Sequence, residues 1–409
     1  MQTPLLSPHV LIAGGGIGGL SAGIACAQKG LTVRLYERST PVGDVGAGIQ
    51  LGPNVTRILD AWGVLPRLAQ QACEPERLVA RAMASGRVLG EVPLRGRARE
   101  KYGAPYVTVH RGDLHAALFS HLGALADSAD VFVHAGTAVT GLVQASTDDV
   151  GLQLDNGQIV QGDAVVGADG LWSAVRGLAW NDGSPTATGH VAYRASVAMG
   201  DLPKALRAMD VTVWLGPRAH VVHYPIRGGQ TMNIVVIAEG VPVVDRESWE
   251  NRVRSQTVHE ALGTCCAALS ELMAAVPMAS ASGDSGWRAW QLFDRAPVQS
   301  GDALVRDRVV LLGDAAHPMR PYLAQGAAMA IEDAQGLSYA LAGDVSGVTQ
   351  RLSNYADTRW QRCARVQATA RRNGDVFHAS GLTRLGRDAA MWAMGRRLMD
   401  PAWLYGYAM

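Results

Sequence analysis

The run GPRAHVVHYPI (216–226) carries the side chains best suited to proton transfer in this 409-residue chain. If the run is an extended strand, its side chains alternate between two faces. His220 and Tyr224 then share one face, while His223 points the other way. A histidine and a tyrosine on the pocket side of a sheet could bind a phenol and remove its proton. His220 is thus a candidate catalytic base, with Tyr224 as its candidate partner. Because periodicity alone does not say which face is buried, a hydrogen-bonded sheet histidine without a chemical role is the alternative.

A glycine-rich turn near the start of the chain could hold a phosphate. Gly14, Gly16 and Gly19 form G-x-G-x-x-G between an apolar run and an alanine-rich run, and Glu37 ends the next apolar run. Such glycines let the backbone approach a pyrophosphate at a helix amino terminus, and the acid hydrogen-bonds a ribose diol. An acid here would repel a 2′-phosphate, which excludes NADP at this turn and leaves NAD or FAD. Arg38 follows the acid and is predicted to belong to the same cofactor site.

Two acidic dipeptides follow apolar runs later in the chain. Asp169-Gly170 ends the run AVVGADG, and Gly313-Asp314 ends the run VVLLGD. A carboxylate at the carboxyl edge of a sheet is well placed to accept hydrogen bonds from a sugar-alcohol hydroxyl. His317 follows the second dipeptide and is a rival candidate for the base, although a structural cap of that loop is the simpler interpretation.

Composition and charge narrow the class of protein. The formal net charge is +1, so no broad electrostatic attraction to nucleic acid or to an acidic membrane surface is expected. The five cysteines form no C-x-x-C pair, which favours reduced thiols, a cytoplasmic protein and no metal motif. The apolar opening run is dense in glycine and no basic residue precedes it, so we expect neither a signal peptide nor a membrane span.

The elements that must position these residues indicate an α/β fold. The order strand, turn, helix, strand around the first glycines predicts a Rossmann-like cofactor domain with a mixed sheet, formed by residues 1–180 and 291–350. Alternating β-branched runs between 181 and 290 predict an inserted antiparallel sheet that binds substrate. A hairpin near 77–93 is expected to join that sheet. Residues 351–409 are predicted to form a helical segment at the carboxyl end.

The three motifs, in this order, resemble those of the single-component FAD-dependent aromatic hydroxylases, and the likeness covers nearly the whole chain. The runs GDVGAGIQLGPN, KYGAPYVTVHRGDLHAAL, VAYRA and LGPRAHVVHYPIRGG are similar to those of hydroxylases of small hydroxylated aromatic acids. These are 3-hydroxybenzoate 6-hydroxylase, salicylate hydroxylase and 6-hydroxynicotinate 3-monooxygenase. The resemblance implies tightly but non-covalently bound FAD and NADH or NADPH as a transient co-substrate. It also implies that reduced flavin and O2 form a C4a-hydroperoxide, which hydroxylates the aromatic acid.

The resemblance also assigns contacts with the cofactor. Asp314 would hold the ribityl chain, and Arg111 would contact the flavin. Backbone N–H groups at the start of the helix expected after the loop would stabilise negative charge on the reduced flavin. Beyond the first turn, the predicted cofactor-binding residues are Gly48, Arg111, Asp169, Gly170, Gly313, Asp314, Gly326 and Ala327.

Substrate contacts are predicted from the same runs. The histidine and tyrosine that correspond to His220 and Tyr224 line the substrate site in relatives, so the resemblance implies His220 as the base and Tyr224 as its partner. Gln50, Pro321 and Tyr322 are expected to face the pocket, and Arg218 is a candidate partner for a substrate carboxylate, with Arg320 as a second candidate. The 3-hydroxybenzoate hydroxylases carry glutamine in place of Pro321, and the nicotinate enzymes carry histidine in place of Tyr322. The resemblance therefore leaves the particular aromatic acid open.

Other functions fit parts of this pattern. A flavin oxidase or dehydrogenase on the same scaffold would need no phenol-activating base. An NAD-dependent dehydrogenase would lack the yellow colour of a flavoprotein, and a ligand-binding relative would hold FAD without substrate-stimulated NAD(P)H oxidation. A hydroxypyridine acid or a larger aromatic ring is an alternative substrate. We expect a monomer or a homodimer.

Overall fold

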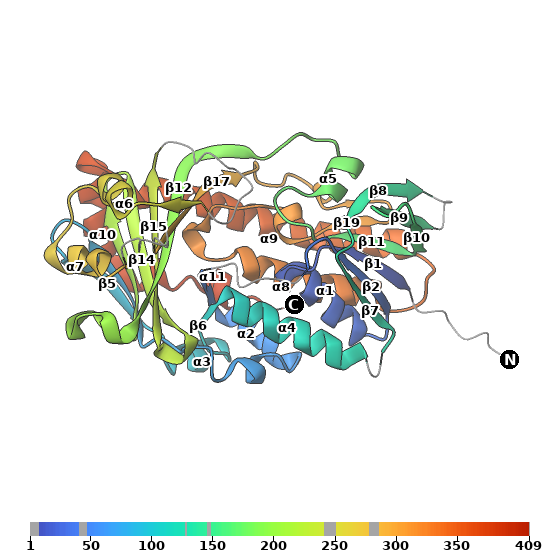
Figure 1. Cartoon of the computed structure of the whole chain (residues 1–409), viewed down its shortest axis with the longest axis horizontal. Coiled ribbons are helices and arrows are strands. Elements are labelled where there is room, and N and C mark those ends of the chain that lie inside the picture. Colours follow the sequence, from blue (N-terminus) through green and yellow to red (C-terminus); the bar gives the residue numbers. More distant parts are fainter. Residues whose placement is uncertain are drawn as a thin grey trace.

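The computed structural model describes residues 8–40, 47–126, 129–144, 149–240, 251–277 and 286–408. Residues 43–46 of the run GDVGAGIQLGPN lie outside these ranges. Two large sheets, joined by helices, make up the molecule (Figure 1). The first has the strand order β18-β19-β11-β1-β2-β7, and its neighbours are parallel except for β18 with β19. The bounds are β1 (His9–Ala13), β2 (Thr32–Glu37), β7 (Val131–Ala135), β11 (Ala164–Gly167), β18 (Val305–Arg306) and β19 (Val309–Leu311).

Helices pack against this parallel sheet. α1 (Ile17–Ala27) lies against both α4 (Arg111–Ala126) and α8 (Gly326–Leu341). A Cβ on Gly23 of α1 would lie 3.1 Å from the side chain of Leu122 in α4, so a glycine permits the close approach of these two helices. A three-stranded antiparallel sheet lies against the face of β2 that carries Arg34 and Tyr36. Its strands are β8 (Val139–Gln144), β9 (Val150–Leu154) and β10 (Ile159–Gly162).

The second large sheet has the order β16-β17-β12-β15-β14-β13-β4-β5. Its strands are β4 (Arg77–Ala82), β5 (Val88–Pro93), β12 (Thr186–Ala198), β13 (Val211–Gly216), β14 (Ala219–Ile226), β15 (Thr231–Glu239), β16 (Arg252–Val253) and β17 (Trp287–Asp294). The strands from within 181–290 pair antiparallel as predicted, and the hairpin joins them through a parallel pair of β4 with β13, which the sequence did not predict. The β4–β5 hairpin comes from residues 1–180, the first part of the predicted cofactor domain. Its strand β4 lies beside β13 and runs in the same direction.

The two faces of the second sheet have different partners. Val221 and Val236 belong to the core that includes side chains of α6 (Ser255–Leu262) and α7 (Ala267–Ala274). Ala192 and Ile237 lie on the opposite face and pack with Tyr322, which comes from the loop before α8. Because side chains alternate along each strand, one face of the sheet packs against α6 and α7, and the other faces the loop before α8.

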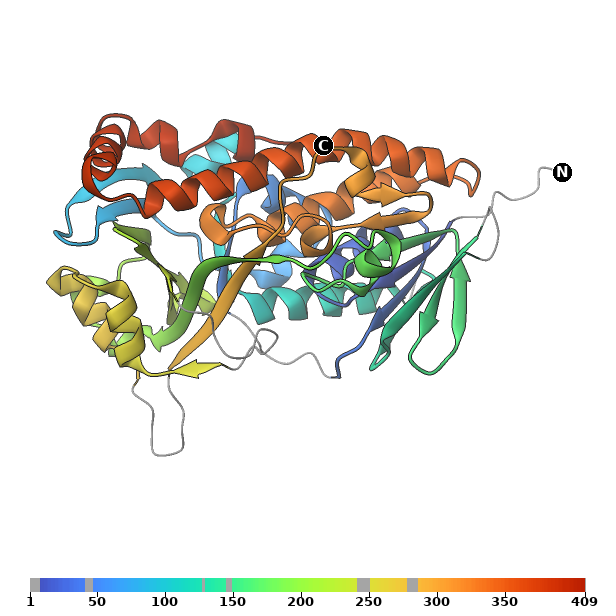
Figure 2. The same cartoon turned by 90° about the horizontal axis from the view of Figure 1, so that it is seen from above.

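The carboxyl-terminal helices connect the two halves. Figure 2 shows α9 (Val348–Phe377) running along much of the molecule, with α10 (Gly381–Met399) folding back near β5. Arg359 of α9 is buried and pairs with both Glu332 and Asp333 of α8, at 3.0 Å and 2.6 Å. Removing one member of such a network would leave an uncompensated buried charge, so the network holds α9 in register with α8.

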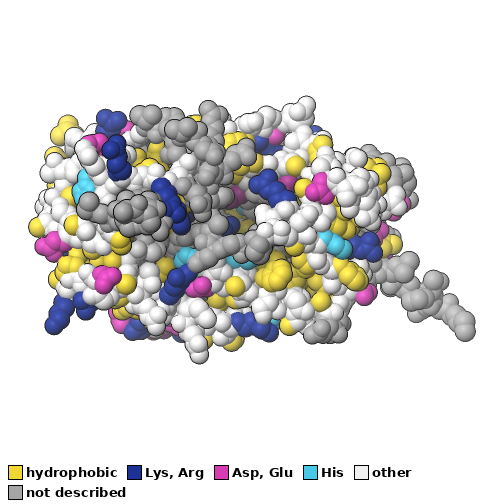
Figure 3. All heavy atoms as spheres, in the orientation of Figure 1, with side chains coloured by type: hydrophobic (Ala, Val, Ile, Leu, Met, Phe, Trp, Pro, Cys, Tyr) yellow, Lys and Arg dark blue, Asp and Glu magenta, His cyan; other side chains and the backbone are white. Residues whose placement is uncertain are grey.

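The remaining regular elements are β3 (Gly48–Leu51), β6 (Val107–His110), α2 (Pro53–Ala61), α3 (Arg97–Tyr102), α5 (Ala174–Ala179) and α11 (Ala402–Tyr405), besides short 3-10 turns. Within the described residues no helix is both long enough and apolar enough to span a bilayer. The face drawn in Figure 3 carries basic and acidic side chains that are interspersed. The predicted α/β class, with an inserted sheet and a helical carboxyl end, is confirmed.

Candidate active site

The turn between β1 and α1 requires glycine for steric reasons. Gly14 has a φ of +102°, and a Cβ there would lie 2.5 Å from the carbonyl oxygen of Ala168. A Cβ on Gly19 would lie 1.9 Å from the carbonyl oxygen of Gly14. Gly16 faces open space, since no heavy atom of the described residues lies within 4 Å of where its Cβ would be. The turn therefore leaves room for a phosphate at the amino end of α1.

Glu37 ends β2 beside this turn. Its carboxylate accepts hydrogen bonds from the backbone N–H of Gly15 at 2.6 Å and of Ser39 at 2.8 Å. Each carboxylate oxygen has a second acceptor site, so the group can still accept the hydroxyls of a ribose. Arg38 is exposed at the same strand end.

The Asp-Gly motif is connected to the Gly-Asp loop by an arginine. Asp169 accepts a hydrogen bond from the hydroxyl of Ser173 at 2.6 Å, and Gly170 has a φ of +80° that favours glycine. Arg176, on α5, donates to the carbonyl oxygens of residues 315 and 316 at 2.9 Å and 2.8 Å. The carboxyl ends of β11 and β19 are thereby held side by side.

The Gly-Asp loop is held by a buried ion pair. Gly313 donates its N–H to Asp333 at 3.1 Å, and His317 Nε2 lies 2.6 Å from the same carboxylate oxygen. Burial opposes a charge on His317, but Cys363 and Asp333 together raise the pKa of its imidazole well above 6.5. This pairing supports the structural interpretation of His317 rather than a role as the base.

Asp314 lies in a recess. Its side chain is exposed to solvent, yet the protein around it raises the pKa of its carboxyl, with His317 and Arg111 opposing that shift. An exposed side chain and a raised pKa occur together when a carboxyl reaches solvent at the bottom of a recess, where protein atoms replace most of the surrounding water. Arg111 begins α4, and burial lowers the pKa of its guanidinium while the charge of Asp314 acts in the opposite direction.

The amino end of α8 lies next to Asp314. A Cβ on Gly326 would lie 3.9 Å from Oδ1 of Asp314. No side chain of the described residues caps this helix end at Gln325, and the first N–H groups, from Gly326 and Ala327 onward, have no acceptor within the helix. This end therefore carries partial positive charge toward the recess.

His220 lies on β14, inside a cluster of rings. It is 1% exposed, and its Nδ1 is 2.9 Å from Nε2 of His378, the residue that follows α9. Its ring centroid is 5.2 Å from that of Tyr322 and 5.3 Å from that of Phe377. Burial, helped by His378 and His190, keeps the pKa of His220 well below 6.5. The imidazole is thus neutral near pH 7 and able to accept a proton.

Tyr224 lies four residues further along the same strand. It is 3% exposed, and burial raises the pKa of its phenol, so it stays protonated. A Cβ on Gly48 would come within 2.6 Å of the Tyr224 ring, which explains the glycine there. Gln50 accepts a hydrogen bond from Tyr106 at 2.6 Å and also interacts with Tyr224. His223, on the opposite face, stacks with Trp214 instead.

Arg194 was not among the predicted site residues. It lies on β12 in register with Val235, which pairs with Val222 of β14. Its guanidinium lies over the ring of Trp290. Among the described residues its buried Nε has no hydrogen-bond partner. The alternation within VAYRA, read as a strand with Ala192 on the inner face, is the sequence signal that could have found it.

Two predicted substrate ligands are corrected. Arg218 lies in the turn between β13 and β14, with a φ of +60°, a side chain that is 75% exposed and an ion pair with Glu239 at 2.9 Å. It is turned to solvent because the tight turn points it outward, so the prediction that it lines the pocket is wrong. Arg320, the second candidate, pairs with buried Asp294 at 2.8 Å. Of the loop residues, Tyr322 is buried and bonded to His190 through its hydroxyl, while Pro321 is half-buried.

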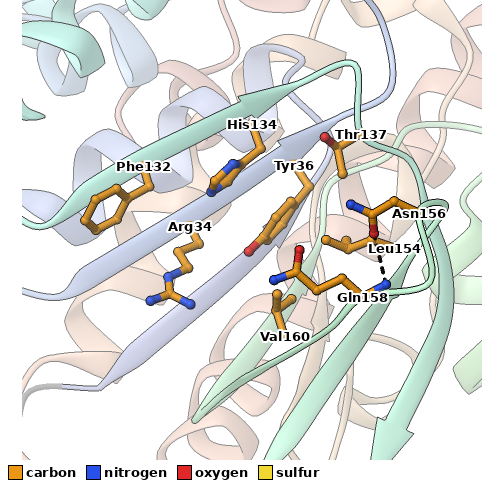
Figure 4. Close-up of a pocket in the computed structure, with 9 residues that line it drawn as sticks. All are labelled: Arg34, Tyr36, Phe132, His134, Thr137, Leu154, Asn156, Gln158 and Val160. Carbon is orange, nitrogen blue, oxygen red and sulfur yellow. Dashed lines mark hydrogen bonds between the residues drawn. The ribbon is translucent and has the colours of Figure 1, made fainter.

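A separate small pocket lies away from these residues. Its volume is about 240 Å³, and it is bounded by side chains of β2 and β7 on one side and of the β9–β10 hairpin on the other. Figure 4 shows Arg34 and Tyr36 from β2 beside Phe132 and His134 from β7. Tyr36 and His134 stack at 4.9 Å.

The arrangement fits a dinucleotide-binding protein, with the second sheet packed against the loop that precedes α8. The open turn at Gly16, the accessible carboxylate of Asp314 and the uncapped amino end of α8 fit the pyrophosphate, the sugar alcohol and the electron-rich ring of a flavin dinucleotide.

Residues 8–370 match the FAD binding domain family, so the chain belongs to that family. The 3-hydroxybenzoate 6-hydroxylase 1 of Aquipseudomonas alcaligenes is 36% identical over 97% of this chain and 97% of the relative. The 3-amino-4-hydroxybenzoate 2-monooxygenase of Streptomyces platensis is 35% identical over 98% of this chain and 96% of the relative. A salicylate hydroxylase solved in complex with its substrate has a TM-score of 0.79 at 21% identity, covering 98% of this chain and 96% of that one. The chain is thus a flavoprotein monooxygenase related to aromatic hydroxylases, and the predicted family and FAD are confirmed.

Proposed function

We propose that the protein hydroxylates a small hydroxylated aromatic acid, such as a 3-hydroxybenzoate-like or salicylate-like acid, with FAD, NADH or NADPH and O2. FAD, when bound, supplies the electron transfer and the activation of oxygen. The residues of the chain bind and orient the acid, move its phenolic proton and keep water out. The relatives named above act on hydroxybenzoates, which supports this class of substrate.

The observation that carries the proposal is the guanidinium of Arg194, a half-buried residue whose Nε is buried without a hydrogen-bond partner among the described residues. A buried charge without a partner is costly, so such a site favours an anionic ligand. A benzoate-type carboxylate would supply the missing partner through charge-assisted hydrogen bonds. Tyr224 is close enough to influence the pKa of Arg194, which indicates that the two groups face one space.

The positions of His220 and Tyr224 support activation of the ring hydroxyl. Both flank Val222 on β14, two residues away on either side, and Val222 is joined to Arg194 through Val235. Neighbouring strands are about 4.8 Å apart, so the backbones of β12 and β14 are separated by about 10 Å. An arginine side chain and one aromatic ring can span that gap. Neutral His220 would remove the phenolic proton, and protonated Tyr224 would donate a hydrogen bond to the oxygen.

Phenolate formation matters because hydroxylation of the ring needs electron density. A phenolate is far richer in electrons than a phenol, and a base at the hydroxyl supplies that activation. The aromatic cluster around His220 excludes water from the site, which limits the loss of reduced cofactor equivalents to hydrogen peroxide.

The test uses the purified yellow protein with a panel of hydroxybenzoates and hydroxypyridine acids. NAD(P)H oxidation and O2 uptake are followed, and products are identified by mass spectrometry in ¹⁸O2. One acid should accelerate NAD(P)H oxidation and gain a single labelled oxygen atom.

Two other results would overturn parts of the proposal. Turnover of an acid without label in the product would favour an oxidase or dehydrogenase. If no small acid stimulates oxidation, a larger aromatic ring becomes the better substrate class.

A further inference from the structure

His378 lies outside the predicted site, yet its imidazole is in direct contact with His220. It follows the last residue of α9 and lies 158 residues along the chain from His220, and its side chain is 4% exposed. Its Nε2 is 2.9 Å from Nδ1 of His220, and the two ring centroids are 5.2 Å apart. A hydrogen bond between two neutral imidazoles needs a proton on one of these nitrogens and none on the other.

Glu239 favours one of the two arrangements. Its Oε1 lies 3.8 Å from Nδ1 of His378, which is too far for a direct hydrogen bond, and that nitrogen is buried without a hydrogen-bond partner among the described residues. Oε2 of Glu239 is held by Arg218 at 2.9 Å, so the carboxylate acts on Nδ1 through its charge. A carboxylate beside Nδ1 favours a proton on that nitrogen, and Nε2 of His378 is then an acceptor. His220 must therefore donate from Nδ1, which leaves its Nε2 without a proton and free to act as a base.

Other charged groups around the two rings do not reverse this preference. Burial, His190 and Arg387 lower the pKa of His378 to about 4, so both rings are neutral near pH 7. Arg387 is itself paired with Asp388 at 2.8 Å. The titratable and charged groups that face the two imidazoles or their partner His190 are Glu239, Tyr322, Arg320, Asp294, Asp375 and Arg387.

We propose that His378 is a positioning residue, oriented by Glu239, that holds His220 in the tautomer required of a base and carries its proton toward solvent. The inference rests on the proposed function, because it assumes that His220 deprotonates the substrate. As Nε2 of His220 takes the phenolic proton, the proton on Nδ1 moves to Nε2 of His378. The proton on Nδ1 of His378 leaves past Glu239, whose side chain is 36% exposed. One proton enters the chain, one leaves, and no electron is moved.

The first test compares two substitutions of His378 in the holoenzyme. His378→Gln keeps an acceptor near the position of Nε2, whereas His378→Phe keeps only the ring volume. With the acid that the wild-type protein hydroxylates, we expect His378→Phe to slow single-turnover hydroxylation on the order of 10–100-fold, with the Kd of the acid changed far less. His378→Gln should lose less of the rate near neutral pH, because its side-chain oxygen can still accept the Nδ1 proton of His220, and both variants should approach the wild-type rate at high pH, where the substrate is already deprotonated. Glu239→Gln should shift the pH profile in the same direction as His378→Phe.

Exposed His259, on α6, provides the matched control, and His259→Gln should leave rate and pH profile unchanged. A wild-type rate and pH profile in His378→Phe would overturn the proposal. Equal losses in the Gln and Phe variants at every pH would also overturn it, since they would show that only packing matters.

A second test needs no activity and no variant of His378. ¹⁵N NMR of the histidine-labelled holoenzyme distinguishes the two neutral tautomers, and the His220 signals are assigned by their loss in His220→Gln. Both His220 and His378 should carry their proton on Nδ1. A proton on Nε2 of His220 would overturn the inference. If the wild-type protein hydroxylates no acid, the proposed function fails, while this measurement still decides the tautomer.

Discussion

The guanidinium carbon of Arg194 lies 5.1 Å from the centre of the Trp290 ring, on the sheet face that also carries Tyr224. The stacking orients the guanidinium but does not neutralise it, because an aromatic face offers far less stabilisation than a carboxylate. The charge is therefore available to an anionic ligand.

Arg194→Met should weaken binding of the aromatic acid by about 10–100-fold, the loss expected for one charge-assisted contact of about 1.5–3 kcal/mol. Without ligand the variant should be at least as stable as the wild type, since a buried unpaired charge is removed. Titration of the flavin absorbance with the acid measures the first effect and thermal unfolding the second. Arg218→Met, at an exposed position, is the control. Affinity within twofold of wild type in Arg194→Met would exclude the carboxylate contact.

His220→Gln should reduce the rate of hydroxylation by on the order of 10²-fold while FAD content and reduction by NAD(P)H are retained. The pKa of His220 lies well below 6.5, so the wild-type base stays neutral as pH falls through 6.5. The single-turnover rate of the wild type should therefore not fall with a midpoint at that pH. Stopped-flow absorbance between pH 5.5 and 8 measures this single-turnover rate. A midpoint near 6.5 would instead indicate a solvent-exposed base.

The ion pair of His317 and Asp333 should make stability depend on pH. The folded pKa of His317 is raised, so its contribution is fully present below the unfolded value of 6.5 and is lost as pH rises through the raised pKa. The folded pKa of Asp333 is lowered by His317 and Arg359 despite burial, so its contribution is lost only in strong acid. The free energy of unfolding lost in His317→Gln should be largest near pH 6 and smaller in alkali. Urea unfolding at several pH values checks this, and a loss that is independent of pH would contradict it.

Gly19→Ala should release FAD. The added Cβ would meet the carbonyl oxygen of Gly14 at 1.9 Å, so the turn must open and the phosphate site is lost. The ratio of flavin to protein absorbance after gel filtration measures retention. Gly123→Ala is the matched control, because a Cβ at this exposed position of α4 meets nothing within 4 Å among the described residues. The control should keep FAD and gain up to about 1 kcal/mol of stability from helix propensity. Full FAD content in Gly19→Ala would show that the turn tolerates the side chain.

Local sequence patterns were enough to predict features that depend on residues close together in the chain. The glycine spacing predicted a turn whose sterics require Gly14 and Gly19, and the alternation of β14 put His220 and Tyr224 on one face. The sequence did not predict the parallel pairing of β4 with β13. Alternating side chains look the same in a parallel and an antiparallel strand, so the pattern does not show the relative direction of two strands that are far apart in the chain.

The sequence by itself therefore determined the cofactor turn and the strand that carries the candidate base, since both rest on short-range spacing, and it indicated the class of protein through its resemblance to known hydroxylases. Only the tertiary structure decided which arginine lies inside. Arg218 lies in a turn that exposes its side chain, whereas Arg194 lies within a paired strand and its Nε is buried. Tertiary packing alone brought His378 from the end of α9 to His220, because a helix docked by buried ion pairs joins residues that no sequence period relates.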